Sequence, residues 1–72
     1  MTAEEFVQAF SAEIGIRPPT SDEVEALLDL ASIAAHTSER IAAPLACWMA
    51  GVSGLPTPKL LAAAQRVAGE AT

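Results

Sequence analysis

The first apolar run of the chain has helical spacing, and its members are Phe6, Val7, Phe10 and Ile14. Thr2 and Glu5 precede it with the spacing of a capping box, in which each residue satisfies a backbone N–H group of the first turn. Gly15 is suited to the position just after a helix. We therefore predict a helix over residues 2–14, followed by a stiff, extended connector at residues 17–19, where two prolines follow an arginine.

A second helix is predicted from Thr20 or Ser21, because Thr20 and Glu23 again have capping-box spacing. Its expected inward face consists of Val24, Leu27, Leu28, Ala31 and Ala35. The opposite face is a polar stripe made of Glu25, Asp29, Ser32 and His36. The polar segment 37–40 interrupts the apolar pattern and should end the helix.

Residues 41–52 contain no charged or strongly polar side chain. Pro44 fits the first turn of a new helix, where its missing N–H group costs nothing. A helix that is apolar on all sides is normally buried. We therefore predict that residues 44–52 form the central helix of a bundle, with Trp48 and Met49 as the bulk of the core.

Thr57 is a suitable N-cap and Pro58 a suitable first residue for a fourth helix. Its expected inner face consists of Leu60, Leu61, Ala64, Val67 and Ala68. With no strand pattern and only short connections, residues 1–72 are predicted to be a single all-α domain, a compact bundle of four short helices with a central apolar helix and antiparallel neighbours. Alanine occupies 16 of the 72 positions, so the core should be thin and a partner surface would favour it.

The charge balance excludes several classes of partner. Nine acidic residues face four basic ones, giving a formal net charge of -5. This argues against binding to nucleic acid, which needs clustered cations, and against an anionic membrane surface. No uncharged stretch reaches the roughly 20 apolar residues of a membrane span, and the start is acidic where a signal peptide would be basic. Together with the single cysteine, Cys47, these features predict a cytoplasmic protein.

His36, Glu39 and Arg40 are the most chemically suggestive cluster, because a histidine near carboxylates can act as a general base. A histidine in the last turn of a helix also interacts well with the free carbonyl groups there, and this structural interpretation is favoured. One histidine and one cysteine on different segments do not form a metal site. No nucleophile is paired with a base, so we expect no catalytic residue, no metal, no cofactor and no enzymatic activity.

Two further positions carry alternative interpretations. Lys59, after Thr57 and Pro58, could help a helix N-terminus to hold a phosphate or carboxylate, although an ordinary cap followed by a solvated lysine is favoured. Trp48 is most simply a core residue. If Trp48 reaches the surface instead, it becomes the leading candidate for an interface anchor, since tryptophan is enriched at binding hot spots.

The run from Leu27 to Leu45 resembles a small actinobacterial domain of unknown function, DUF6457. The specific part of the resemblance is Ala35-His36, Glu39-Arg40 and Ala43-Pro44-Leu45, followed by the apolar helix that ends near Gly51. This domain type occurs alone and also as a C-terminal extension of molybdenum cofactor guanylyltransferases. The resemblance implies no activity, but it implies an association with molybdenum cofactor biosynthesis or with molybdoenzymes.

Three functions are consistent with these observations. The first is a non-catalytic accessory module that binds a protein partner through an exposed apolar surface or through His36, Glu39 and Arg40. The second is a binder of a small anionic ligand through His36 and Arg40, with Lys59 as an optional third contact, which requires these side chains to meet at one pocket. The third is a homo-oligomerisation domain.

Overall fold

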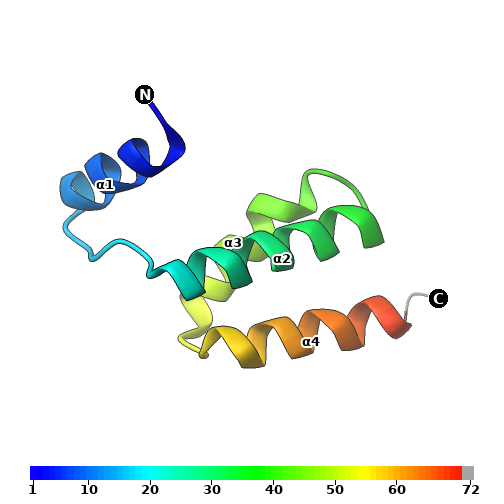
Figure 1. The fold of residues 1–72 in the computed structure, drawn as a ribbon. Coiled ribbons are helices and arrows are strands. Elements are labelled where there is room, and N and C mark those ends of the chain that lie inside the picture. Colours follow the sequence, from blue (N-terminus) through cyan, green and yellow to red (C-terminus); the bar gives the residue numbers. More distant parts are fainter. Residues whose placement is uncertain (71–72) are drawn as a thin grey trace.

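The computed structural model describes residues 1–70, and within that range it is built of α-helices and contains no strand (Figure 1). Four helices follow one another along the chain: α1 (Ala3–Ile14), α2 (Ser21–Thr37), α3 (Ala42–Ser53) and α4 (Thr57–Glu70). The prediction of an all-α bundle is confirmed.

Capping boxes start α1 and α2 as the sequence predicts. The Thr2 hydroxyl accepts a hydrogen bond from the Glu5 N–H group at 3.1 Å, and the Glu5 carboxylate accepts one from the Thr2 N–H group at 2.9 Å. Thr20 and Glu23 form the same pair of bonds at 3.2 and 2.8 Å. Each box satisfies N–H groups that a helix start would otherwise leave free.

The other two helices start slightly away from their predicted positions. The N–H group of Ala42 donates to the Glu39 carbonyl at 3.0 Å, so α3 begins two residues before Pro44, which still lies in its first turn. The Leu60 N–H group donates to the Pro56 carbonyl at 3.2 Å. Thr57 is therefore the first helical residue and not the predicted N-cap.

α2 is the helix that contacts two others, α3 and α4 (Figure 1). It packs against α3 and against α4, whereas α3 and α4 share no comparable set of contacts. The chain reverses direction twice, between α2 and α3 and between α3 and α4, so α4 runs parallel to α2. The central position thus belongs to α2, and the apolar α3 lies on one side of it.

The burial predicted for Trp48 and Met49 is wrong, since these side chains are 69% and 63% exposed. The α3 side chains that are shielded from solvent are small: Ala42, Ala43, Ala46, Cys47 and Ala50. Its exposed side chains include the large ones: Ile41, Leu45, Trp48, Met49 and Val52. Small side chains allow the two helix backbones to approach closely, and this explains why α3 presents its small side to α2.

The inward face of α2 is also rotated from the predicted one. Leu28, expected inside, is 65% exposed, whereas Leu30 is 8% exposed. The cause is that α2 contacts two helices and therefore buries a wider face than a helix with one neighbour, including Leu30 and Ile33. The predicted polar stripe does face solvent.

α1 stands apart from the other helices (Figure 1). Phe6 and Phe10 stack with their ring centroids 5.6 Å apart, yet they remain 55% and 52% exposed. Gly15 ends the helix in the left-handed conformation, with φ of 76°, and the Ile16 N–H group donates back to the Ser11 carbonyl at 3.0 Å. Among residues 1–70, the apolar face of α1 thus has no extensive contact with another helix.

The connector between α1 and α2 is held by an ion pair. Arg17 donates to both carboxylate oxygens of Glu23, at 2.7 and 2.9 Å, and its Nη1 also donates to the Pro18 carbonyl at 3.0 Å. Pro18 and Pro19 fix their own φ angles. Together these features hold the connector in one shape, in which α1 points away from α2.

This ion pair predicts a pH dependence. The hydrogen bonds from Arg17, helped by the Thr20 N–H group, lower the pKa of Glu23 from 4.5 to about 2. Because the folded pKa is lower, the pair stabilises the fold fully above pH 4.5 and loses this contribution as the pH falls from 4.5 towards 2. We expect Arg17→Gln to raise the Glu23 pKa towards its ordinary value in an NMR titration of the carboxyl carbons, and Arg66→Gln to leave it in place. An unchanged Glu23 pKa in Arg17→Gln would contradict the ion pair.

Candidate functional site

His36 lies in the last turn of α2 and is exposed. Its Nδ1 is 2.7 Å from the Ser32 carbonyl oxygen and 3.1 Å from the Ser32 hydroxyl. In the tautomer with a hydrogen on Nδ1, the ring donates to a carbonyl group of its own helix. This geometry matches the structural interpretation of His36 as a C-terminal helix residue.

Glu39 and Arg40 form the turn between α2 and α3. Their carbonyl groups accept from the N–H groups of Ala42 and Ala43, at 3.0 and 3.2 Å, and so start α3. Both side chains are exposed, and within residues 1–70 they take part in no hydrogen bond or ion pair. The backbone of this turn is therefore structural, and its two charged side chains are free to meet a partner.

Lys59 lies at the other end of the bundle from His36 and Arg40. The start of α4 lies beside the start of α2, since a recess there is lined by Glu23 and Leu27 together with Thr57 and Leu60. Glu23 and His36 are about 20 Å apart along α2, at 1.5 Å per residue. The structure therefore does not bring the side chains of His36, Arg40 and Lys59 to one pocket.

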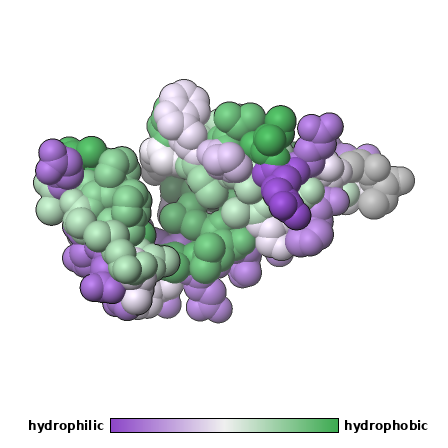
Figure 2. Space-filling model, turned by 90° about the horizontal axis from the view of Figure 1, so that it is seen from above, coloured by the Kyte–Doolittle hydropathy of each residue, from purple (hydrophilic) through white to green (hydrophobic). Residues whose placement is uncertain are grey.

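The outer side of α3 carries an exposed apolar surface, which we call the Trp48 face. It consists of Ile41, Leu45, Trp48 and Val52, spaced by four, three and four, and these side chains are 61–69% exposed. No charged residue lies within α3. Seen from above, hydrophobic side chains spread over the helical body beside a hollow that separates it from α1 (Figure 2). Contiguous exposed apolar patches of this kind mark interaction sites.

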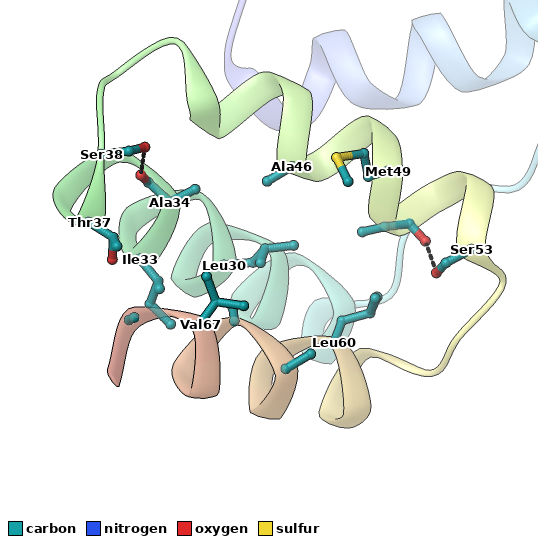
Figure 3. Close-up of a pocket in the computed structure, with 14 residues that line it drawn as sticks. Leu30, Ile33, Ala34, Thr37, Ser38, Ala46, Met49, Ser53, Leu60 and Val67 are labelled. Carbon is teal, nitrogen blue, oxygen red and sulfur yellow. Dashed lines mark hydrogen bonds between the residues drawn. The ribbon is translucent and has the colours of Figure 1, made fainter. Parts of the chain in front are cut away.

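A second apolar feature is a groove of about 480 Å³ between α3 and α4, with α2 as its floor (Figure 3). The floor includes Leu30 and Ile33, and the walls include Ala46 and Met49 of α3 and Leu60 and Val67 of α4. The Ser38 and Ser53 hydroxyls on its rim donate to the carbonyl groups of Ala34 and Ala50, at 2.8 and 2.7 Å. The groove thus offers an apolar surface with few free polar groups.

The sequence did not predict this groove. The one signal for the groove is the repeat of leucine, alanine and valine along one side of α4, a pattern that predicts a buried inner face. That side faces a space that the chain itself does not fill, because α3 and α4 diverge from their shared floor.

Among residues 1–70, no group of three or more histidine, cysteine, aspartate or glutamate side chains could hold a metal ion. In the same range, no helix has both the length and the apolar character needed to cross a membrane.

Comparison with known proteins identifies a family. A search of the curated proteins and a search of the solved structures each found no match to the chain. A family model described as a domain of unknown function (DUF6457) matches residues 1–72. The match extends beyond the run from Leu27 to Leu45 that carries the resemblance, and covers all four helices. The chain therefore belongs to the DUF6457 family.

Proposed function

We propose that this chain is a non-catalytic helical accessory module that docks onto a protein partner through the Trp48 face. The observation that carries the proposal is the exposure of Trp48, at 69%, in the middle of an uncharged helix. A large indole that faces water contributes little to the fold, whereas tryptophan at the centre of an interface is a frequent hot spot. Arg40, exposed at the start of α3, supplies a polar contact at the rim.

The partner named in this proposal is a molybdenum cofactor assembly enzyme or a molybdoenzyme subunit in the cytoplasm. The support for this choice is the resemblance to the domain that extends molybdenum cofactor guanylyltransferases. The net charge of -5 adds that a complementary surface should be apolar at its centre and basic at its rim. Association should then slow as the salt concentration rises.

The alternative of a small anionic ligand gains no support from the geometry. Lys59, the optional third contact, lies at the far end of α2 from His36 and Arg40, so at most these two side chains remain for an anion. His36 is also turned towards its own helix, with Nδ1 at 2.7 Å from the Ser32 carbonyl oxygen.

The proposal is tested by affinity capture from an extract of the source cells, followed by binding measurements with the purified candidate. We expect the chain to enrich a cofactor assembly enzyme or a molybdoenzyme, and Trp48→Ala to weaken binding by about 30-fold or more, as at a hot spot. Leu28→Ala is the matched control, because it removes an exposed leucine from α2 and should leave binding unchanged.

The variants separate the parts of the proposal. Retention of the partner by Trp48→Ala would refute the Trp48 face as the docking surface. Loss of the partner in Arg40→Ala, with folding intact, would extend the surface to the turn before α3. Capture of a protein unrelated to molybdenum chemistry would refute the named partner.

A further inference from the structure

The surface of the chain is too large for a compact protein of its mass. Its accessible surface is 5542 Å², whereas a compact monomer of 7.4 kDa is expected to expose about 4200 Å². No side chain within residues 1–70 is fully buried. The excess of roughly 1300 Å² exceeds the ~800 Å² per partner that a standard protein–protein interface buries.

Two apolar surfaces contribute to this excess, and neither is covered by another part of residues 1–70. One is the groove between α3 and α4, which is the open side of the body formed by α2, α3 and α4. The other is the apolar face of α1, with Phe6, Phe10 and Ile14 between 51% and 55% exposed. A helix of 12 residues is marginally stable alone in water, so α1 needs a surface to pack against.

The dimensions and the chemistry of the two surfaces match. α1 and α3 each have 12 residues, or about 18 Å of helix, so α1 can lie along the full length of the groove wall. A fourth helix in the groove would complete a bundle around the floor formed by α2. Small-molecule sites use a few convergent polar groups. Three hydroxyl residues line this groove, and two of them, Ser38 and Ser53, already donate to backbone carbonyl groups, which leaves Thr37.

The charges of α1 and of the groove walls are complementary. α1 carries Glu4, Glu5 and Glu13 and no cation. α3 is uncharged. α4 carries Lys59 and Arg66, which are seven residues apart and therefore lie on one side of the helix, and Glu70 at its end. Neither cation has an ion-pair partner within residues 1–70. Neither of them lines the groove itself, so an acidic helix in the groove would meet them at its rim.

The connector determines whether the groove can receive α1 of the same chain or only α1 of a second copy. Within one chain, the Arg17–Glu23 pair and the two prolines hold α1 away from the body. Folding α1 back onto its own groove would break this arrangement, whereas a second copy can supply α1 with the connector unchanged. We propose that two copies of the chain exchange α1, each inserting Phe6, Phe10 and Ile14 into the groove between α3 and α4 of the other.

The test is the mass of the whole 72-residue chain in solution by light scattering after size exclusion. We expect twice the 7.4 kDa of one chain. Phe10→Glu should raise the dimer dissociation constant by about 30-fold or more, as for a hot-spot aromatic. Glutamate favours helix more than phenylalanine does, so α1 itself should persist. Ala12→Glu, which adds the same charge on the opposite side of α1, should remain dimeric.

Two further measurements locate the contact. Val67→Glu changes an exposed side chain on the groove wall and should weaken the dimer as Phe10→Glu does. In a mixture of labelled and unlabelled chains, isotope-filtered NMR should detect contacts between the Phe10 ring and the Val67 methyl groups of different chains. A monomeric parent chain, a dimer that Phe10→Glu leaves intact, or contacts only within one chain would each overturn the proposal. The Trp48 face is not used, so Trp48→Ala should stay dimeric, and this result is independent of the partner experiment.

Discussion

Replacing Leu30 with alanine is expected to lower the free energy of unfolding by about 2–3 kcal/mol, at the lower end of the range for Leu→Ala changes in a core. Leu30 is 8% exposed and is the one large apolar side chain in the buried class within residues 1–70. It lies on the groove floor, where α2 meets both of its partners (Figure 3). The open groove already removes some of its neighbours, and this explains the modest value.

The effect is nevertheless large for this chain. A domain of 72 residues has a total stability of about 4–10 kcal/mol. Urea unfolding followed by circular dichroism at one protein concentration measures the loss. Leu28→Ala is the control on the same helix, and at 65% exposure it should change the stability by less than about 0.5 kcal/mol. Equal losses of stability in the two variants would show that α2 presents a different side to α3 and α4 from the one described.

Replacing Ala43 with leucine is expected to destabilise the fold by about 1–3 kcal/mol, because the larger side chain overpacks the contact between α3 and α2. Ala43 is partly shielded and does not line the groove, and Cys47 follows it one turn later on the same side of α3. This side consists of small residues. A leucine there must push the two helices apart or adopt a strained rotamer.

The matched control is a substitution of leucine by alanine two residues further along α3. Leu45→Ala removes a large side chain from the Trp48 face, where it is 61% exposed, and should change the stability by less than about 0.5 kcal/mol. Thermal unfolding by calorimetry compares the two variants. A stable Ala43→Leu together with an unstable Leu45→Ala would mean that α3 packs through its large side.

The helices and their ends could be predicted from the sequence because their causes are local. The capping boxes at Thr2 and Thr20 each depend on residues three positions apart. Gly15 ends α1 through a left-handed conformation that other residues adopt at a cost of about 1 kcal/mol or more. The error at Thr57 is also local, since Pro56 supplies the first helical carbonyl group.

The rotation of each helix could not be predicted in the same way. α3 has no charged side chain, and its one hydroxyl residue, Ser53, is the last of the helix, so hydrophobicity alone does not distinguish the alanine side from the tryptophan side. The inference that an apolar helix is buried also assumes that the chain fills its own interior. Here the open groove and the unpartnered α1 show that it does not.

The candidate site was predicted in part. The geometry of His36 agrees with the structural interpretation favoured from its position in α2. Trp48 lies at the surface, the location for which the sequence makes it the leading candidate for an interface anchor. The separation of Lys59 from Arg40 depends on α2 and α4 being parallel, a tertiary feature that no residue spacing reveals.

The position of Trp48 also determines how this protein can be observed. The chain has one tryptophan and no tyrosine, so its indole fluorescence comes from Trp48 alone. Because the indole is 69% exposed, it emits as in water both in the native chain and after denaturation. The fluorescence emission of Trp48 therefore changes little when the chain unfolds. A partner that covers the indole ring would shift this emission to shorter wavelengths, so the emission can be used to detect docking.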